Sequence, residues 1–379
     1  MRIVVISHTP HYRSGNRLVG WGATVRELDR LAGLFDELVH VAPVHEGPAP
    51  ASELAYEAPN LRVVAVPPAG GETLMAKIGI LRVMPRWVAA IWRELDRSDV
   101  VHVRCPSNIG LVASLLLLIR RTPVPRWIKY AGNWRPRGRE SWSYRLQRWL
   151  LARRALRALV TINGEWPSQP AHVQSFFNPC LTHEELRDAS AAAKAKVLTE
   201  PVRLLFVGRL EEAKGIGRAI EVTARLRAAG LSMVLEIVGD GPGRSAFEAL
   251  AKDVGIAESV TFHGWLARPQ LSAVYRRAHF VLLPSRSEGW PKVLSEGMAY
   301  GVLPVTSDVG SIPQILRGFR IGRALPVEDL NAFAAAIAGY VRAPETWKTE
   351  AHRAAEAARS FSYDAYLDAV RKLLNLRAA

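Results

Sequence analysis

The sequence predicts an α/β protein made of two doubly wound, parallel-sheet domains in tandem. Apolar, β-branched runs without polar alternation recur along the chain, and such runs are typical of strands that helices cover on both faces. A polar, alanine-rich stretch at residues 181–200 interrupts this pattern, which restarts at Val202. The length of 379 residues, 49% of them hydrophobic, also suits two domains better than one.

In the first half, the run at residues 2–7 predicts the opening strand, and the apolar spacing at residues 24–34 predicts a helix. A polar loop that contains Gly15, Gly20 and Gly22 is expected between them. Further strands are expected at residues 37–42, 61–66, 100–103, 127–130 and 159–162. Helical stretches fit between these strands, which indicates βαβ units and therefore a parallel sheet.

The second half repeats this arrangement. Buried strands are expected at residues 202–208, 234–238, 260–262, 280–283 and 303–306. An amphipathic helix is expected at residues 362–376. We therefore assign residues 1–185 to a first domain, 186–360 to a second, and 361–379 to a C-terminal helical segment.

Composition argues against zinc-binding, disulfide-rich, secreted and membrane-spanning classes of protein. Cys105 and Cys180 stand in no CxxC or histidine-rich setting, so neither a zinc site nor a disulfide framework is expected. No apolar run approaches the about 20 residues that span a bilayer, and the N-terminus lacks a secretory apolar region. We therefore expect a cytoplasmic protein. The net charge of +15 predicts an anionic partner, and the first 180 residues hold 24 of the 50 basic but only 13 of the 35 acidic residues.

The loop after the strand at 202–208 carries the first candidate binding residues. Arg209 and Lys214 lie five residues apart, directly after Gly208, at the carboxyl end of a strand where doubly wound sheets bind ligands. The planar guanidinium of Arg209 and the compact ammonium of Lys214 can bind the same anion. The equally weighted alternative is that both are solvent-exposed loop cations that bind no ligand. Gly239, in the turn after the next strand, would let a ligand approach the backbone.

Two glutamates bracket a predicted helix start in the segment 285–301. Pro291 suits the first position of a helix, whose first-turn amides would form an anion site. These amides belong to Lys292, Val293 and Leu294. Glu288 precedes the helix and Glu296 lies inside it, and carboxylates are good partners for vicinal sugar hydroxyls. We interpret Glu296 as a ribose ligand and Glu288 as a ligand of a transferred sugar; the alternative is a capping residue and an exposed helix acid.

Residues 201–320 resemble the nucleotide-binding domain of glycosyltransferase family 4, retaining enzymes of the GT-B fold. The similarity rests on VGRLEEAKG, VGDGPGR and EGWPKVLSEGMAYGVLPVTSDVGSIPQIL, where Glu288 and Glu296 match the family's two glutamates separated by seven residues. The resemblance implies two Rossmann-like domains that face a central cleft, and a C-terminal helix that crosses back to the first domain. It also implies that Arg209 and Lys214 hold the donor diphosphate, that Glu296 binds the ribose, and that Glu288 binds the donor sugar.

The first half is similar to the family more loosely. The stretch SHTPHYRSGNRLVGWGATVRELDRLA resembles the family's opening but lacks its adjacent glycine pair, and Gly22 is one of the glycines that could replace it. The family often carries a histidine near the donor sugar; Asn133 stands at that place, and it can hydrogen-bond but not titrate. His102 is a nearby alternative, although a lone histidine in a strand is more often structural.

The resemblance implies transfer with retention from a nucleotide sugar, with UDP favoured over GDP as the carrier. No Asp-x-Asp motif stands out, so cations are expected to stabilise the leaving diphosphate in place of a metal. No cofactor is expected, because the nucleotide sugar is a substrate. No protein nucleophile is evident, which favours front-face attack by the acceptor.

Residues 134–157 hold eight arginines and one acid, Glu140, with Trp142, Tyr144 and Trp149 among them. This pattern predicts peripheral contact with an anionic membrane at the inner face of the cell membrane; an arginine-rich helix packed across the domain is an equal alternative. Nucleic-acid binding is not expected. Membrane contact would suit a glycan or lipid-linked acceptor in bacterial surface polysaccharide or lipopolysaccharide assembly.

Two further functions stay open at this point. A nucleotide-sugar epimerase of the same fold would convert the donor without an acceptor. A non-catalytic nucleotide-sugar-binding protein at the membrane would not turn the donor over at all.

Overall fold

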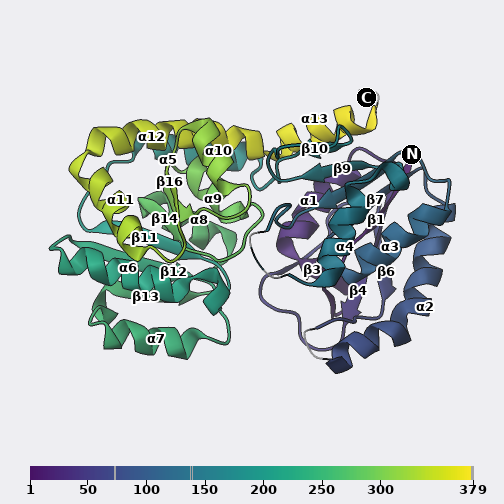
Figure 1. Ribbon diagram of the computed structural model, residues 1–379, viewed down its shortest axis with the longest axis horizontal. Coiled ribbons are helices and arrows are strands. Elements are labelled where there is room, and N and C mark those ends of the chain that lie inside the picture. The colour runs from purple at the N-terminus through teal and green to yellow at the C-terminus, as the bar shows by residue number, and fades with distance from the viewer. Residues whose placement is uncertain (72–73, 137, 139, 377–379) are drawn as a thin grey trace. The chain divides into compact units, whose positions relative to one another are not determined.

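The computed structural model describes residues 1–71, 74–136, 138 and 140–376, which form two compact units (Figure 1). Unit 1 comprises Met1–Phe176 together with the chain from Tyr366 onward, and unit 2 comprises Phe177–Ala365. The boundary after Phe176 comes earlier than the expected one after residue 185. The reason is that Cys180 and Leu181, which precede helix α5 (His183–Ala195), are buried in the core of unit 2.

Unit 1 is built on a ten-stranded sheet with the order β10-β9-β8-β7-β1-β4-β2-β3-β5, and β6 also pairs with β4. Its strands are β1 (Arg2–Ile6), β2 (His11–Ser14), β3 (Arg17–Trp21), β4 (Glu37–His45), β5 (Glu53–Ala55), β6 (Leu61–Val66), β7 (Val100–Cys105), β8 (Arg126–Tyr130), β9 (Leu159–Ile162) and β10 (Val173–Ser175). The neighbours of β1, which are β4 and β7, pair with it in parallel, as the apolar runs predicted. The short strands β5 and β10 have no apolar run and were not predicted.

The helices of unit 1 cover both faces of this sheet. They are α1 (Gly22–Ala32), α2 (Leu74–Asp96), α3 (Asn108–Ile119), α4 (Trp142–Leu151), the 3-10 turn η1 (Arg154–Leu156) and most of α13 (Tyr363–Leu374). Val4 and Ile6 of β1 pack into one hydrophobic cluster with α2 and α3. Ile3 and Val5 pack into a second cluster with α1 and α13. Burial on both faces explains why β1 is apolar from Ile3 to Ile6.

The glycine-containing loop expected after β1 is instead a β-hairpin. Strands β2 and β3 pair antiparallel, with Ser14 opposite Arg17, so that Gly15 and Asn16 form a two-residue turn. Gly15 has φ of +58°, which suits the left-handed turns that close tight hairpins. Gly20 is opposite the ring of His11, which would lie 2.7 Å from any added Cβ. The Gly-Asn pair was a hairpin signal that the prediction of a loop overlooked.

Unit 2 has a six-stranded sheet, and every neighbouring pair of its strands is parallel. The order is β13-β12-β11-β14-β15-β16. The strands are β11 (Val202–Val207), β12 (Met233–Val238), β13 (Val260–Gly264), β14 (Phe280–Leu283), β15 (Leu303–Ser307) and β16 (Arg323–Leu325). The order reverses between β11 and β14, and such a switch point is where ligands bind to doubly wound sheets.

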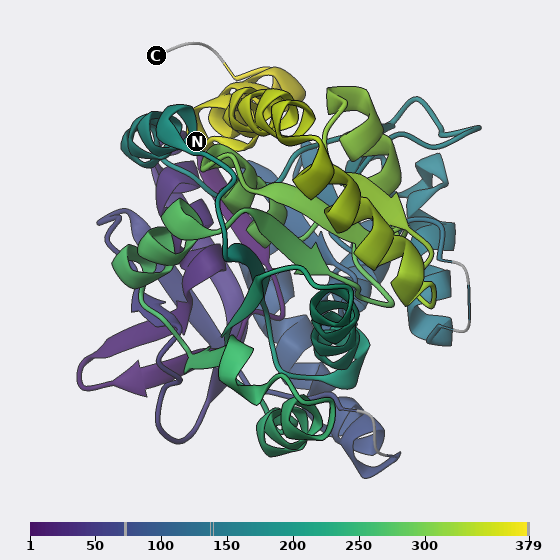
Figure 2. The ribbon, with the colours of Figure 1, turned by 90° about the vertical axis from the view of Figure 1, so that its left-hand side faces the viewer.

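The helices of unit 2 lie on both sides of its sheet, as Figure 2 shows with this unit toward the viewer. Besides α5, they are α6 (Ile216–Ala228), α7 (Arg244–Asp253), α8 (Arg268–Arg277), α9 (Lys292–Ala299), α10 (Ile312–Phe319), α11 (Leu330–Arg342) and α12 (Pro344–Ala357), with 3-10 turns at Glu212–Lys214, Ala257–Ser259 and Ala358–Phe361. Within the described residues of both units, no helix combines the length and the apolar character needed to cross a bilayer.

Candidate functional site

Two loops of unit 2 meet at the switch point. One follows β11 and the other follows β14, and Arg286 of the second donates its backbone N–H to Ala213 of the first at 3.0 Å. Gly215 has φ of +84°, and an added Cβ would lie 2.0 Å from the carbonyl oxygen of Pro284. Gly215 therefore has to be glycine for the two loops to touch.

This contact brings Lys214 and Glu288 together across 74 positions of sequence. The Nζ atom of Lys214 lies 2.8 Å from Oε1 of Glu288, and Ser285 Oγ donates to the same oxygen at 3.0 Å. The side chain of Glu288 is only 10% exposed, whereas that of Lys214 is 35% exposed. Both residues were candidates from the sequence, but their pairing was not foreseen, and Ser285 was missed.

Arg209 lies in the same loop as Lys214 but has a different partner. Its side chain is 68% exposed, and its Nε lies 2.8 Å from Oε1 of Glu211. The structure therefore gives each of the two cations its own glutamate, rather than one shared partner. Because an exposed ion pair contributes only about 0–1 kcal/mol, an incoming anion could displace Glu211 at little cost.

Gly208 and Gly239 serve the contact between the loops after β11 and β12. Gly239 has φ of +126°, and an added Cβ would lie 2.0 Å from the carbonyl oxygen of Gly208. The N–H of Leu210 donates to Asp240 O at 3.1 Å, so the two loops share a backbone surface. The need for glycine at position 239 thus arises from the chain itself, and not from the approach of a ligand as expected.

Helix α9 begins one residue later than expected, because Pro291 is the N-cap and Lys292 the first helical residue. The N–H of Leu294 donates to Pro291 O at 3.1 Å. The prediction that the Leu294 amide belongs to an anion site is therefore wrong, since this amide closes the first turn. Lys292 and Val293 occupy the first two helical positions, where the helix dipole favours an anion.

Glu296 lies one turn further along α9, and its side chain is only 15% exposed. Arg268 Nη1 lies 3.2 Å from Oε1, and the hydroxyl of Tyr275 donates to Oε2 at 3.0 Å. Although burial opposes it, the carboxylates of Glu296 and Glu185 hold the pKa of Arg268 above its usual value. The alternative interpretation of Glu296 as an exposed helix acid is therefore wrong.

Arg268 and Tyr275 both come from α8 and were missed in the sequence. They lie 28 and 21 positions from Glu296, and only the packing of α8 beside α9 brings them to it. Together with Glu185 they line a small cavity of about 10 Å³ next to the Glu296 carboxylate. A carboxylate has about four acceptor positions, of which these two contacts occupy two.

The candidates in unit 1 are engaged in local structure. Gly22 is the first residue of α1; its N–H donates to Ser52 O at 3.1 Å, and an added Cβ would lie 2.9 Å from that oxygen. The Gly22 amide is therefore not available to a donor phosphate. Asn133 follows β8, where its Oδ1 accepts a hydrogen bond from the N–H of Arg135 at 3.0 Å.

His102, the alternative to Asn133, is a core residue. It is fully buried and stacks on Trp127 with ring centroids 3.7 Å apart, and burial lowers the pKa of its imidazole well below the usual value. His40, on the neighbouring part of the sheet, is likewise buried and bonded to Ser7 Oγ at 2.7 Å and to the Tyr56 hydroxyl at 2.8 Å. Both rings stay neutral inside the fold.

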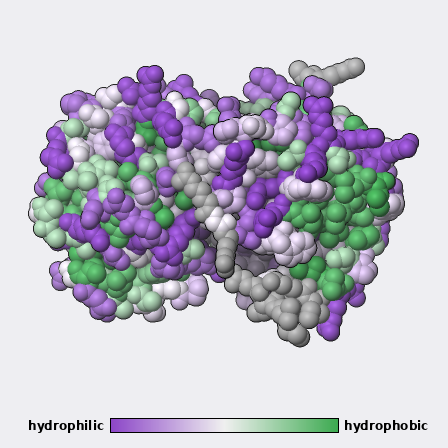
Figure 3. Space-filling view, in the orientation of Figure 1, coloured by the Kyte–Doolittle hydropathy of each residue, from purple (hydrophilic) through white to green (hydrophobic). Residues whose placement is uncertain are grey.

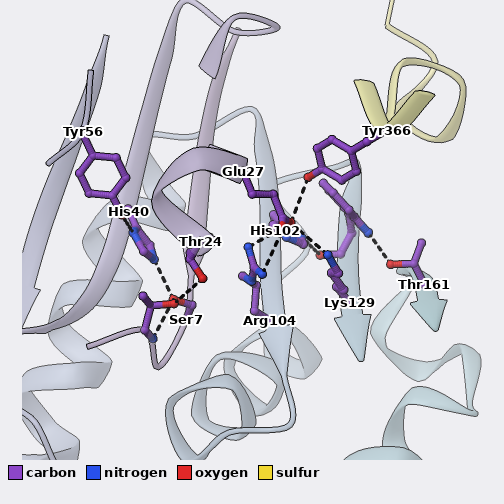
Figure 4. A network of polar contacts seen from close by, with 12 residues as sticks. Ser7, Thr24, Glu27, His40, Tyr56, His102, Arg104, Lys129, Thr161 and Tyr366 are labelled. Atoms are coloured by element: carbon purple, nitrogen blue, oxygen red, sulfur yellow. Dashed lines mark hydrogen bonds and ion pairs between the residues drawn. The ribbon is translucent and has the colours of Figure 1, made fainter. Parts of the chain in front are cut away.

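A buried charge cluster in unit 1 was not predicted at all (Figure 4). Glu27 of α1 has no exposed surface, and its Oε1 lies 3.0 Å from Lys129 Nζ and 3.1 Å from Arg104 Nη1. The hydroxyl of Tyr366, on α13, also points to Glu27 Oε1 at 3.4 Å. The cluster joins α1, β7, β8 and the C-terminal helix, and charges buried in this way are paired because isolated ones would be very costly.

The arginine-rich segment forms α4 and the 3-10 turn behind it, and Arg137 and Arg139 lie outside the described residues. Leu150 and Leu151 are buried, while Trp142 and Trp149 are exposed. A packed helix with snorkelling arginines therefore describes only the inner side of α4. Across the described parts of both units, no group of three or more His, Cys, Asp or Glu side chains is arranged to hold a metal ion.

Comparison with known proteins finds related sequences for the second half of the chain. Residues 189–361 match the family described as glycosyl transferases group 1. The chain is 32% identical over 188 residues to D-inositol 3-phosphate glycosyltransferase of Mycobacterium avium, covering 48% of this chain and 44% of that protein. It is 32% identical over 149 residues to the putative colanic acid biosynthesis glycosyltransferase WcaL of Salmonella typhimurium, covering 38% and 36%. The chain thus spans less than half the length of these relatives.

Solved structures resemble the whole chain at low sequence identity. Sucrose-phosphate synthase from Thermosynechococcus elongatus superposes with a TM-score of 0.73 at 19% identity, covering 99% of this chain and 98% of that one. HepE of Anabaena in complex with UDP and glucose gives 0.68 at 16% identity, covering 99% of each chain. WaaG, a glycosyltransferase involved in lipopolysaccharide biosynthesis, gives 0.63 at 16%, covering 98% and 99%. The chain therefore has the GT-B fold, and its residues 189–361 are similar to the family described as glycosyl transferases group 1.

Proposed function

We propose that this chain is a retaining, metal-independent glycosyltransferase. It moves a sugar from a nucleoside-diphosphate sugar, with UDP favoured over GDP, to a glycan or lipid-linked acceptor in bacterial surface polysaccharide or lipopolysaccharide assembly. The observation that carries the proposal is the meeting of Lys214 and Glu288 at the switch point of unit 2. The family of residues 189–361 and the names of the relatives support it.

In this proposal the donor diphosphate takes the place of the glutamates that pair with Lys214 and Arg209. The diphosphate replaces Glu288 as the partner of Lys214 and Glu211 as the partner of Arg209, and the start of α9 adds the amides of Lys292 and Val293. Glu288, released from the lysine, then accepts hydrogen bonds from hydroxyls of the transferred sugar. Glu296 uses its remaining acceptor positions for the ribose.

The reaction breaks the bond between the sugar's anomeric carbon and the phosphate oxygen, and the electron pair stays on that oxygen. Lys214 and Arg209 stabilise the charge that develops there, in a role that a divalent cation could otherwise fill. The acceptor hydroxyl attacks the anomeric carbon from the face that the phosphate leaves. Its proton passes to the leaving phosphate, so the products are the glycoside and the nucleoside diphosphate.

The donor-site assignment is tested by transfer kinetics of two variants and their controls. Lys214→Ala and Glu288→Gln should each lower kcat/KM by about 100-fold or more, because each removes a contact to charge or hydroxyl at the reacting centre. The exposed residues Lys252 and Glu258 of the same unit give matched controls, Lys252→Ala and Glu258→Gln, which should transfer at the wild-type rate. Wild-type transfer by either donor-site variant would show that these roles are wrongly assigned.

Three further measurements test the nucleotide carrier, the independence from metal, and the type of reaction. A thermal-shift panel of UDP-, GDP- and ADP-sugars identifies the carrier, because only a ligand of the folded state raises Tm. Transfer in the presence of EDTA tests metal independence. Conversion of the donor to an epimer without any acceptor would replace transferase by epimerase, and an intact donor in every assay would indicate a binding protein.

A further inference from the structure

Helix α3 of unit 1 is apolar on its outer as well as its inner face. Val112 and Leu116 are buried in the core, while Leu115, Leu118 and Ile119 are exposed, Ile119 to 72%. The three exposed residues stand at i, i+3 and i+4 and therefore share one face of the helix. Figure 3 shows this face as part of a broad hydrophobic patch on unit 1. A helix that is apolar all round is normally covered on all sides.

Helix α4 packs beside α3 and adds aromatic and cationic side chains. Trp142, Arg145 and Trp149 stand at i, i+3 and i+7, and therefore project from one exposed face. The indole of Trp142 is 72% exposed and that of Trp149 is 51% exposed. The guanidinium of Arg153 lies over the ring of Trp149, 3.7 Å from its centroid, so cation and aromatic ring occupy the same surface.

Arginines outnumber acids by eight to one in segment 134–157, which contains α4. Glu140 is the only acid of segment 134–157, and it is held by Arg148 at 2.6 Å in a half-buried pair. The exposed arginines beside α4 therefore have no acid of their own segment to neutralise them. They include Arg145, Arg153, Arg154 and Arg157.

We propose that the outer face of α3 and the exposed face of α4 form a docking surface for an anionic lipid bilayer. Leucine and isoleucine of α3 would enter the acyl boundary, the indoles would lie at the headgroup level, and the arginines would bind lipid phosphates. A second copy of this chain fits less well, because it would place the same positive charges against each other. Nucleic acid would satisfy the arginines but leave Leu118 and Ile119 without a partner.

Vesicle co-sedimentation of the full chain tests the proposal without any donor or acceptor, so it can fail independently of the proposed glycosyl transfer. The wild type should bind vesicles of phosphatidylcholine mixed with phosphatidylglycerol, bind pure phosphatidylcholine far more weakly, and detach as salt is raised. Arg145→Gln with Arg154→Gln should weaken binding about five-fold per arginine. Trp142→Ser with Trp149→Ser should weaken it about tenfold or more.

Two control variants carry matched changes elsewhere on unit 1. Arg13→Gln with Arg17→Gln, in the exposed hairpin, removes the same net charge, and Trp21→Ser removes an indole that is 49% exposed. Both should bind like the wild type, and thermal unfolding should show that every variant is folded. Equal binding to neutral and anionic vesicles, or equal loss in the controls, would overturn the proposal. The proposal would also be overturned if the Trp142/Trp149 variant still bound vesicles but no longer formed a dimer or no longer bound nucleic acid. Such a result would assign the surface to a second copy of the chain or to nucleic acid.

Discussion

The switch-point loops of unit 2 and the Glu27 cluster of unit 1 arrange their charged side chains differently. In unit 2, Arg209 and Lys214 lie in loops at the carboxyl ends of strands, and their side chains are 68% and 35% exposed. In unit 1, Glu27 is fully buried, and the side chains of Lys129 and Arg104 that converge on it are 5% and 16% exposed. The same kinds of residue therefore form pairs open to solvent in these loops and a fixed internal support around Glu27.

The physical basis of this difference is solvation. An exposed pair is screened by water and can change partners with little loss of free energy. A buried pair has lost its hydration on both sides, so removal of either partner leaves an uncompensated charge in a medium of low dielectric constant. Exposed pairs thus suit a site that has to accept a charged ligand, and the buried cluster suits the place where the C-terminal helix joins unit 1.

The largest expected effect follows from removing Glu27. Glu27→Gln should destabilise unit 1 by about 3–5 kcal/mol, because it removes a fully buried carboxylate that lies 3.0 Å from Lys129 Nζ and 3.1 Å from Arg104 Nη1. Glu288→Gln, at the ion pair of the switch-point loops, should cost less, because the 35% exposed Lys214 can be solvated when its partner is lost. Hydrogen exchange resolved by peptide reports the stability of each unit separately, with β1 and β11 as reporters.

A second variant distinguishes the loss of the charge partner from a general folding defect. Adding Lys129→Met to Glu27→Gln removes one of the two cations that face position 27, so part of the lost protection in β1 should return. Equal losses of protection in units 1 and 2 after Glu27→Gln would show that the contrast between the two kinds of ion pair is mistaken.

Acid should affect unit 1 more strongly than unit 2. Burial lowers the pKa of His11 to about 4 and that of His40 and His102 well below the usual 6.5, while in unit 2 burial and then Lys196 lower the pKa of His279 to about 4. Because the folded-state values are depressed, the stability is fully present above pH 6.5 and is lost as pH falls from 6.5 toward 4. Each such histidine should cost about 1 kcal/mol at pH 5.5.

Hydrogen exchange at pH 7.5 and 5.5, corrected for the intrinsic rate, checks this expectation. Protection in β1 and β4 should fall further than protection in β11 and β12. A greater loss in unit 2 would mean that its surface carboxylates, rather than the buried histidines of unit 1, control acid stability.

The fold was largely predictable because the central parallel strands, such as β1, β7, β11 and β14, are short, predominantly apolar runs that are mostly buried. The run at residues 202–208 and β11 (Val202–Val207) differ by one residue, and the strand at 159–162 coincides with β9. The hairpin β2–β3 was missed because its strands are half-exposed and polar, so the apolar pattern that marks a strand is absent. The Gly15-Asn16 turn was the local signal that remained.

The site was predictable only where its residues lie close together in sequence. Glu288 and Glu296 could be found because they flank one helix start, whereas Arg268 reaches Glu296 from another helix, 28 positions away. The cluster around Glu27 depends on contacts over 77 and 102 positions, which no local pattern contains. Leu294 shows the reverse error, because a one-residue shift of the helix start engaged an amide that was expected to bind an anion.

A smaller effect is expected from the contact that ties the C-terminal helix to the buried cluster. Tyr366→Phe removes a hydrogen bond to Glu27 at 3.4 Å but keeps the ring packing, so unit 1 should lose about 0.5–1.5 kcal/mol. Tyr144→Phe changes an exposed tyrosine of the same unit and should leave the unfolding free energy unchanged. Protection of α13 and β1 measured by hydrogen exchange checks both variants. A loss of protection in α13 alone would mean that Tyr366 is not coupled to the cluster.

The smallest effect on stability is expected at Arg209. This variant tests the exposed ion pair in the comparison with the buried Glu27 cluster. Arg209→Gln breaks an exposed pair with Glu211, so the unfolding free energy should change by less than about 0.5 kcal/mol. Arg225→Gln breaks a similar exposed pair with Glu221 on α6 and serves as the matched control. The two variants should differ only when the nucleoside diphosphate is added: the control should keep the ligand-induced rise in Tm, and Arg209→Gln should lose most of it. If Arg209→Gln instead lowers Tm without ligand and keeps the full rise with it, this exposed cation serves the fold rather than the donor.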